Sequence, residues 1–220
     1  MIILAIPFFT EISSLIGIII VISALYMQSQ TFVDPTIRAI ALQSFILTAL
    51  FALMFLQSGD FTLLYLAIIT AAIRGVLIPR VMLYQVSRFK HSLRETGTGQ
   101  RVPSLVIVGV IIIIVGYLLF KTVLYPVIQI SAVSVPFVLL LLGFLLIVTR
   151  RNVLSQMTGF LEEENAVLYI GALIASSIPL LIEFAVVLDI LGVVLIGVIL
   201  SATREVLHTL ESPDLDQLTG

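Results

Sequence analysis

Three consecutive glutamates, Glu162, Glu163 and Glu164, lie inside an apolar stretch that is long enough to form a membrane helix. An ionisable group in hydrocarbon costs about 2.5 to 3.5 kcal/mol on insertion scales, so such groups face a protein interior and are commonly functional. A further acid, Asp189, lies in the next apolar stretch, and Arg74 lies deep in an earlier one. Carboxylates and a cation at membrane depth indicate a path for protons or other ions.

The three glutamates cannot share one face of a helix. Consecutive helical residues are about 100° apart, so Glu162, Glu163 and Glu164 spread over about 200°. Glu164 and Asp189 each share a stripe with small residues, which permit close helix approach. Because the stretch 175–179 is short enough for a hairpin, we predict that Glu164 and Asp189 are neighbours and exchange protons. Glu162 and Glu163 are predicted to be relay neighbours or helix anchors, and which of the three carries the proton stays open.

The third apolar stretch supplies the cation. Arg74 is expected to tune the charge of a neighbouring carboxylate, with a static ion pair as the alternative. Pro79 removes a backbone donor and would free the carbonyl of Gly75 by kinking the helix. Arg80 is expected to extend to the membrane interface.

Neutral polar side chains at membrane depth are expected to bond between helices rather than to carry water. These are Gln43, Ser44, Thr48, Ser131 and Ser134. The acids have a comparable alternative, which is to pair with buried cations and lock the helices together.

The composition indicates which elements hold these residues. The chain of 220 residues is 60% hydrophobic and only 11% charged, whereas soluble domains are about half apolar and about a quarter charged. We therefore predict an all-α, polytopic membrane protein with seven transmembrane helices. Their predicted ranges are 7–28, 37–57, 61–86, 103–121, 126–149, 153–176 and 180–203. Asp34 is predicted to cap the second helix, and 57–60 to form the turn that ends it.

The distribution of basic residues predicts the orientation, because Lys and Arg concentrate in cytoplasmic loops. In a seven-span chain, all loop cations except Lys121 fall on one side of the membrane. The cations on this side are Arg38, those of the 87–101 loop, Arg150, Arg151 and Arg204. We predict an outside N-terminus and a cytoplasmic C-terminus, with a polar cytoplasmic tail over 205–220.

The remaining composition excludes several function classes. The 11 cationic residues are spread along the chain and form no basic face for nucleic acid. There is no cysteine, and His91 and His208 lie outside the predicted spans, so we expect no metal, haem, iron–sulfur cluster or other cofactor. No phosphate loop or nucleophile motif is present, so the chain is not expected to be an enzyme on its own.

The C-terminal part resembles the last two helices of the K subunit of respiratory complex I. The resemblance depends on Arg151, Asn152, Gly159, Asn165 and Ala166, followed by a short turn and a helix with a mid-membrane acid. That three-helix subunit carries a glutamate in each of its last two spans, within the buried proton-transfer axis of the complex. Asp189 is similar to the second in type and depth. The first of the two K-subunit glutamates corresponds in position to Leu161 of this chain. Glu164 lies about one helical turn further on.

This displaced pattern, and nearly the whole chain, resembles the E-type membrane component of hydrogenase-4 and formate hydrogenlyase-type complexes. The specific positions are Gln43, Ser44, Arg74 five residues before Pro79, Arg151, Asn152, Glu164, Asn165, Asp189 and the final Gln217, Leu218, Thr219 and Gly220. The family tends to have lysine where this chain has Arg74. Because arginine is harder to deprotonate, charge tuning fits Arg74 better than proton carrying.

The resemblance implies a non-redox accessory subunit of a complex I-like membrane-bound hydrogenase or a related respiratory complex in the cell inner (cytoplasmic) membrane. It would couple proton or sodium movement to electron transfer elsewhere. Implied partners are antiporter-like subunits, a membrane anchor subunit and a peripheral redox arm. On this basis we expect a four-helix part over 1–121 and a three-helix, K-like part over 122–204. The alternatives are a structural or assembly subunit and a self-contained ion transporter.

Overall fold

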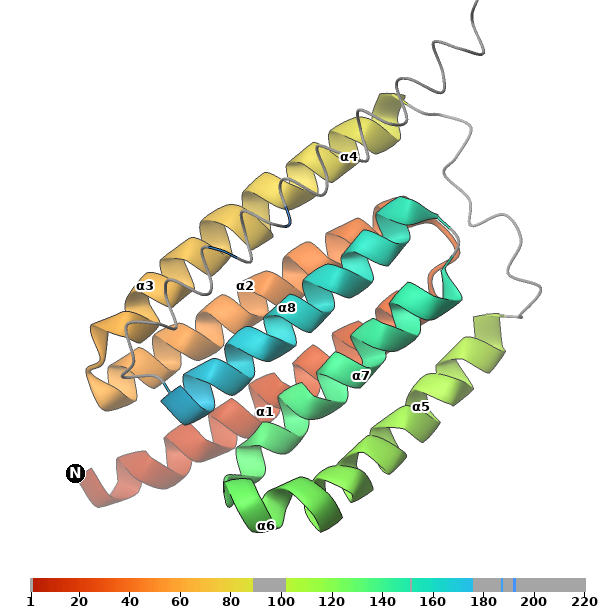
Figure 1. Cartoon of the computed structure of the whole chain (residues 1–220). Helices are drawn as coiled ribbons and strands as arrows, with labels where there is room; N and C mark the ends of the chain where they lie inside the picture. The colour runs from red at the N-terminus through yellow and green to blue at the C-terminus, as the bar shows by residue number, and fades with distance from the viewer. Residues whose placement is uncertain (1, 89–101, 151, 176–186, 188–191, 193–220) are drawn as a thin grey trace, which may run out of the picture.

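The computed structural model describes residues 2–88, 102–150, 152–175, 187 and 192 (Figure 1). This part of the chain consists of helices joined by short turns. The elements are α1 (Ile2–Ser29), α2 (Val33–Ser58), α3 (Phe61–Ile69), the π-helix η1 (Thr70–Leu77), α4 (Ile78–Arg88), α5 (Val102–Leu119), the π-helix η2 (Phe120–Leu124), α6 (Tyr125–Ile128), the 3-10 turn η3 (Ser131–Val133), α7 (Ser134–Thr149) and α8 (Val153–Ala175). The predicted all-α class agrees with these elements.

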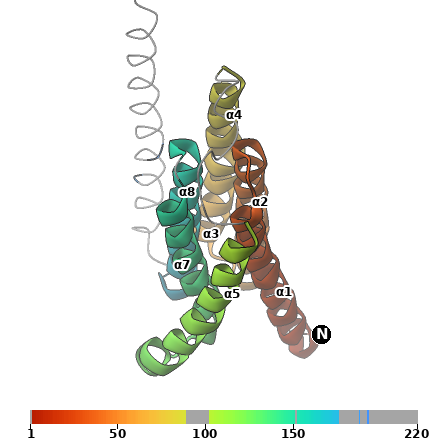
Figure 2. The same cartoon turned by 90° about the vertical axis from the view of Figure 1, so that its right-hand side faces the viewer.

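Long helices lie side by side in the bundle. The rod formed by α3, η1 and α4 packs against α2, and α2 packs against both α1 and α8. The helices α7 and α8 form a closely packed hairpin, and α5 lies at an edge against α1 and α7. In the view turned by 90°, α1 and α2 lie on one side and α7 and α8 on the other (Figure 2). The helix α8 therefore packs against both α7 and α2.

Five helices in the described part are long and apolar enough to cross a membrane. They cover Glu11–Ser29, Val33–Ser58, Phe61–Ser87, Ser104–Ile128 and Ser131–Thr149. The chain is therefore a membrane protein with transmembrane helices. The 23-residue α8 is not among the five, and it is the helix with three consecutive acids in its middle. Seven spans and the predicted orientation stay predictions, and the predicted seventh span lies outside the described residues apart from Val187 and Gly192.

Several predicted helix boundaries need correction. Asp34 does not cap α2, because the cap position is Phe32 and makes no side-chain hydrogen bond. Asp34 lies in the first turn instead and pairs with Arg38 at 2.9 Å. The predicted end of the fourth helix at 121 and the predicted start of the fifth at 126 are also wrong, because the fourth helical rod continues to Ile128 and the next span begins at Ser131. Pro126 lies in the first turn of α6, where the missing N–H is tolerated.

Other predicted breaks agree with the structure. The turn after α2 contains Gly59 at φ 71°, in the left-handed region that favours glycine, and its N–H donates to the carbonyl of Phe55. Before Pro79 the helix widens into η1, in which the N–H of Ile78 donates to the carbonyl of Ile73 five residues back. The irregularity expected at Pro79 is therefore a π-helix.

A polar layer divides the core. One apolar cluster contains Leu47, Leu66 and Tyr169, and a second contains Ile37 and Met82. Along α2, the α3–η1–α4 rod and α8, the residues of the two clusters are separated by buried polar positions. These are Gln43 and Ser44, then Thr70 and Arg74, and then Glu162, Glu164 and Asn165. The three helices thus meet through polar side chains near the middle of the bundle.

Candidate functional site

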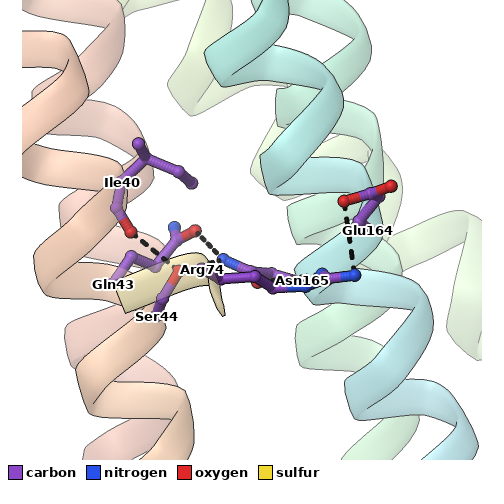
Figure 3. A network of polar contacts seen from close by, with 6 residues as sticks. All are labelled: Ile40, Gln43, Ser44, Arg74, Glu164 and Asn165. Atoms are coloured by element: carbon purple, nitrogen blue, oxygen red, sulfur yellow. Dashed lines mark hydrogen bonds and ion pairs between the residues drawn. The ribbon is translucent and has the colours of Figure 1, made fainter. Parts of the chain in front are cut away.

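A buried ion pair joins η1 to α8. Arg74 Nη2 lies 3.3 Å from Glu164 Oε2, and the side chains are 1% and 3% exposed (Figure 3). A buried pair of this kind is stabilising only when additional hydrogen bonds satisfy its remaining polar atoms. The predicted cation and the predicted carboxylate are therefore in contact, at the middle of their helices.

Asn165 supplies one such bond and connects the pair to α2. Its Oδ1 accepts from Arg74 Nη1 at 3.3 Å. Its Nδ2 lies 3.2 Å from Gln43 Oε1 and 3.2 Å from Ser44 Oγ, and donates to both (Figure 3). Because an amide has both a donor and an acceptor end, one side chain can bridge the cation on η1 to neutral acceptors on α2.

The network continues to α1 through Gln43. Gln43 Nε2 donates to Ser23 Oγ at 3.1 Å and to the carbonyl of Ile20 at 3.4 Å. Ser23 Oγ donates in turn to the same carbonyl at 2.6 Å. The polar layer therefore connects α1, α2, η1 and α8.

The local structure of η1 holds Arg74 in place. A π-helix adds a residue to the turn and thereby changes which side chains face a neighbouring helix. Gly75 follows directly, and a Cβ there would be 2.9 Å from Cζ of Phe45 on α2. The ring of Phe45 therefore packs directly over Gly75, beside the position from which Arg74 reaches Asn165 and Glu164 on α8.

Gly192 lies next to the carboxylate of Glu164. A Cβ on this glycine would lie 3.9 Å from each Glu164 carboxylate oxygen and 3.9 Å from Cδ1 of Ile78. Asp189 lies three residues earlier in sequence and lies outside the described residues. The predicted Glu164–Asp189 contact stays a prediction, and the position of Gly192 beside Glu164 supports it.

The other two glutamates face elsewhere. Glu162 is fully buried, and neither of its carboxylate oxygens has a hydrogen-bond partner within the described ranges. Glu163 is partly buried and faces α7, where its Cγ would lie 2.8 Å from a Cβ on Gly143. The structure brings only Glu164 to Arg74.

Two glycines fix the contact between α7 and α8. A Cβ on Gly143 would be 2.9 Å from the carbonyl oxygen of Gly159, and a Cβ on Gly159 would be 2.9 Å from the carbonyl oxygen of Gly143. Such a close backbone approach leaves little freedom for α8 to rotate. The orientation of the three glutamates is set in part by this contact.

Arg150 is buried rather than a solvent-facing loop cation. Its Nη1 donates to the carbonyl of Gln30 at 2.6 Å, and its Nη2 donates to those of Met27 and Gln28 at 3.0 and 2.9 Å. These carbonyls belong to the last turn of α1 and its exit, where a positive charge is favourable. Arg150 is the C-cap residue of α7, so these bonds fix the end of α1 to the end of α7.

Two of the polar side chains that were expected to bond between helices bond only within their own segment. Thr48 donates to the carbonyl of Ser44 within α2, and Ser134 donates to that of Ser131. Arg80 is exposed.

Asn165 and Ser23 were not predicted as site residues. An amide directly after a buried glutamate was the available signal for Asn165, whereas nothing distinguished Ser23 from other serines in apolar helices. Within the described part no group of three or more His, Asp or Glu could hold a metal ion.

Comparison with known proteins gives distant relatives. The chain is 26% identical over 185 residues to the uncharacterized protein Rv0085 of Mycobacterium tuberculosis, covering 83% of each chain. It is 25% identical over 186 residues to hydrogenase-4 component E of Escherichia coli and of Shigella flexneri, covering 82% of this chain and 83% of theirs. No family model and no solved structure matches. The resemblance to hydrogenase-4 component E is confirmed at this distance.

Proposed function

We propose that this chain is a non-redox membrane subunit of a hydrogenase-like or related respiratory complex, in which the Arg74–Glu164 pair takes part in proton or sodium translocation. The similarity to hydrogenase-4 component E over 82% of the chain supports the complex. The buried ion pair in the middle of the bundle is the observation that carries the ion-transfer role.

The chemistry of the pair suits a switch. Arginine keeps its proton under all ordinary conditions, so only Glu164 can change charge within the pair. When Glu164 takes up a proton, its ion pair with Arg74 is neutralised, while Asn165 Oδ1 can still accept from Arg74. A proton arriving at Glu164 would therefore alter the bonds that connect η1 to α2 and α8.

Asp189 is proposed as the exchange partner of Glu164. Gly192 shares the helical stripe of Asp189 by sequence, and its small size leaves room beside the Glu164 carboxylate. Protons would pass between the two acids, and movement of ions would be coupled to electron transfer in other subunits. In this proposal the chain is an accessory subunit of the inner membrane rather than an enzyme.

The proposed partners are antiporter-like membrane subunits, a membrane anchor subunit and a peripheral redox arm. Affinity purification of the tagged full chain in mild detergent, followed by mass spectrometry, should recover them in defined stoichiometry. Recovery of the chain alone at native expression would contradict membership of a complex.

A structural or assembly role is the second candidate, and the bridging bonds of Asn165 between η1, α2 and α8 favour it. The Asp189→Asn variant separates the two roles. Ion transfer predicts an assembled complex with reduced translocation. A purely structural role predicts reduced assembly, with normal translocation by whatever complex forms.

A further inference from the structure

Three buried polar side chains follow a second stripe of α8. Ser155, Thr158 and Glu162 are separated by three and four residues, so they lie one above another on one face. They are 1%, 0% and 0% exposed. Glu164 lies about 200° around the helix from Glu162. This stripe is therefore separate from the ion pair.

The stripe contains polar atoms that the described residues do not satisfy. Ser155 Oγ and both carboxylate oxygens of Glu162 have no hydrogen-bond partner among the described residues. Thr158 donates only to the carbonyl of Ser155, at 2.7 Å. Buried polar groups in proteins are almost always bonded, and internal water fills the role where side chains do not.

No cation in the described helices around α8 is available to Glu162. Between 134 and 149, α7 has no acidic or basic residue, and in α2 the only two are Asp34 and Arg38, which pair with each other. From 11 to 29, α1 has only Glu11. Arg74 pairs with Glu164 on another face of α8. The adjacent residue, Glu163, is an acid and cannot supply a positive charge.

The stripe leads from one end of α8 to the polar layer. Ser155 lies in the first turn, close to the half-buried Asn152, whose Oδ1 accepts from the N–H of Leu154 at 2.9 Å. Glu162 lies about 10 Å further along the axis. Asn165 follows three residues later and belongs to the network of Arg74 and Glu164.

We propose that Ser155, Thr158 and Glu162 bind a chain of internal water molecules through which protons reach the polar layer from the start of α8. A proton from this water binds one carboxylate oxygen of Glu162 and leaves to the next water towards Asn165. The carboxyl group returns to its starting form, so charge is conserved in each passage. This inference rests on the proposed ion-transfer function.

Hydration of the stripe can be measured directly. The full chain, isotope-labelled and reconstituted in lipid bilayers, is studied by water-edited solid-state NMR. Transfer of magnetisation from water to Ser155 Cβ and Glu162 Cδ should be severalfold faster than to Thr36 Cβ. Thr36 is equally buried, but its hydroxyl donates to the carbonyl of Phe32. Equal transfer to all three side chains would overturn the proposal.

A second experiment measures the rate of proton translocation by the assembled complex. Glu162→Gln should slow proton translocation severalfold, Glu162→Asp should restore part of it, and the control Thr36→Val should change nothing. An unchanged rate in Glu162→Gln, with a clear loss in Glu164→Gln, would overturn the water path and leave the proposed function intact. Unchanged rates in both variants would contradict the proposed function as well.

Discussion

Two glutamates that are two residues apart on α8 have opposite surroundings. Glu164 contacts a buried arginine, and the neighbouring Asn165 connects that arginine to α2. Glu162 is buried to the same extent and has no partner within the described part of the chain. A helix places residues i and i+2 about 200° apart, so a single helix can serve two separate polar environments.

The difference shows that burial alone does not define a role. A paired carboxylate stabilises the bundle and changes its bonds when it is protonated. A buried carboxylate without a side-chain or backbone partner is unusual, and internal water commonly bonds such a group. The following four substitutions test this contrast, beginning with the largest expected effect.

Arg74→Met should destabilise the bundle most. It removes one member of a buried ion pair, and a removal of this kind costs about 3 to 5 kcal/mol. Unfolding in mixed detergent micelles measures the loss. The double variant Arg74→Met with Glu164→Gln should recover most of it, and a double variant no more stable than the single one would contradict an energetically coupled pair.

Gly159→Ala should have the next largest effect, because it disturbs the contact that orients both glutamates. The new methyl group would meet the backbone carbonyl of Gly143 at 2.9 Å. Overpacking of this kind costs about 1 to 3 kcal/mol. Gly116→Ala is a suitable control, because the closest atom there is the flexible Cδ1 of Leu141. Equal melting temperatures for the two variants would count against a fixed α7–α8 contact.

Asn165→Leu should lower the free energy of unfolding by less than the two preceding substitutions. It removes three interhelical bonds, and such bonds average about 0.6 kcal/mol each in membrane proteins, so the total is about 2 kcal/mol. The loss should appear in the same unfolding assay. Thr48→Val removes a bond within α2 only and should be nearly neutral. A neutral Asn165→Leu would show that Asn165 does not bridge the helices.

Glu162→Gln should have the smallest effect on stability, less than about 1 kcal/mol, because no ion pair is lost. The measurement is again the free energy of unfolding. A loss comparable to that of Arg74→Met would reveal a cation bound to Glu162 and remove the contrast between the two glutamates.

The all-α class and the five long apolar helices of the described part were predictable from sequence. Apolar stretches of about 20 residues, the turn at Gly59 and the irregularity near Pro79 follow from local rules, and three acids in such a stretch are conspicuous. The end of the fourth helix was not predictable, because a proline such as Pro126 occurs both in the first turn of a new helix and at an irregularity within a continuing one. Local sequence does not decide between the two.

The partners of the buried groups depend on packing between distant segments. Sequence placed Arg74 and Glu164 at similar depth, but the bridge through Asn165 and the α1 carbonyls held by Arg150 depend on which helices are neighbours. The inward face of Glu162 depends likewise on the Gly143–Gly159 contact. Periodicity shows which residues share a face but not what that face meets.

The most direct test of the ion-transfer role is translocation per electron by the assembled complex carrying Glu164→Gln. Glu11→Gln, the same change at an exposed glutamate, is the matched control. We expect the Glu164 variant to assemble and transfer electrons while moving markedly fewer ions per electron, with the Glu11 variant unchanged. An intact Glu164→Gln complex that moves as many ions per electron as the unaltered complex would contradict the role of this pair.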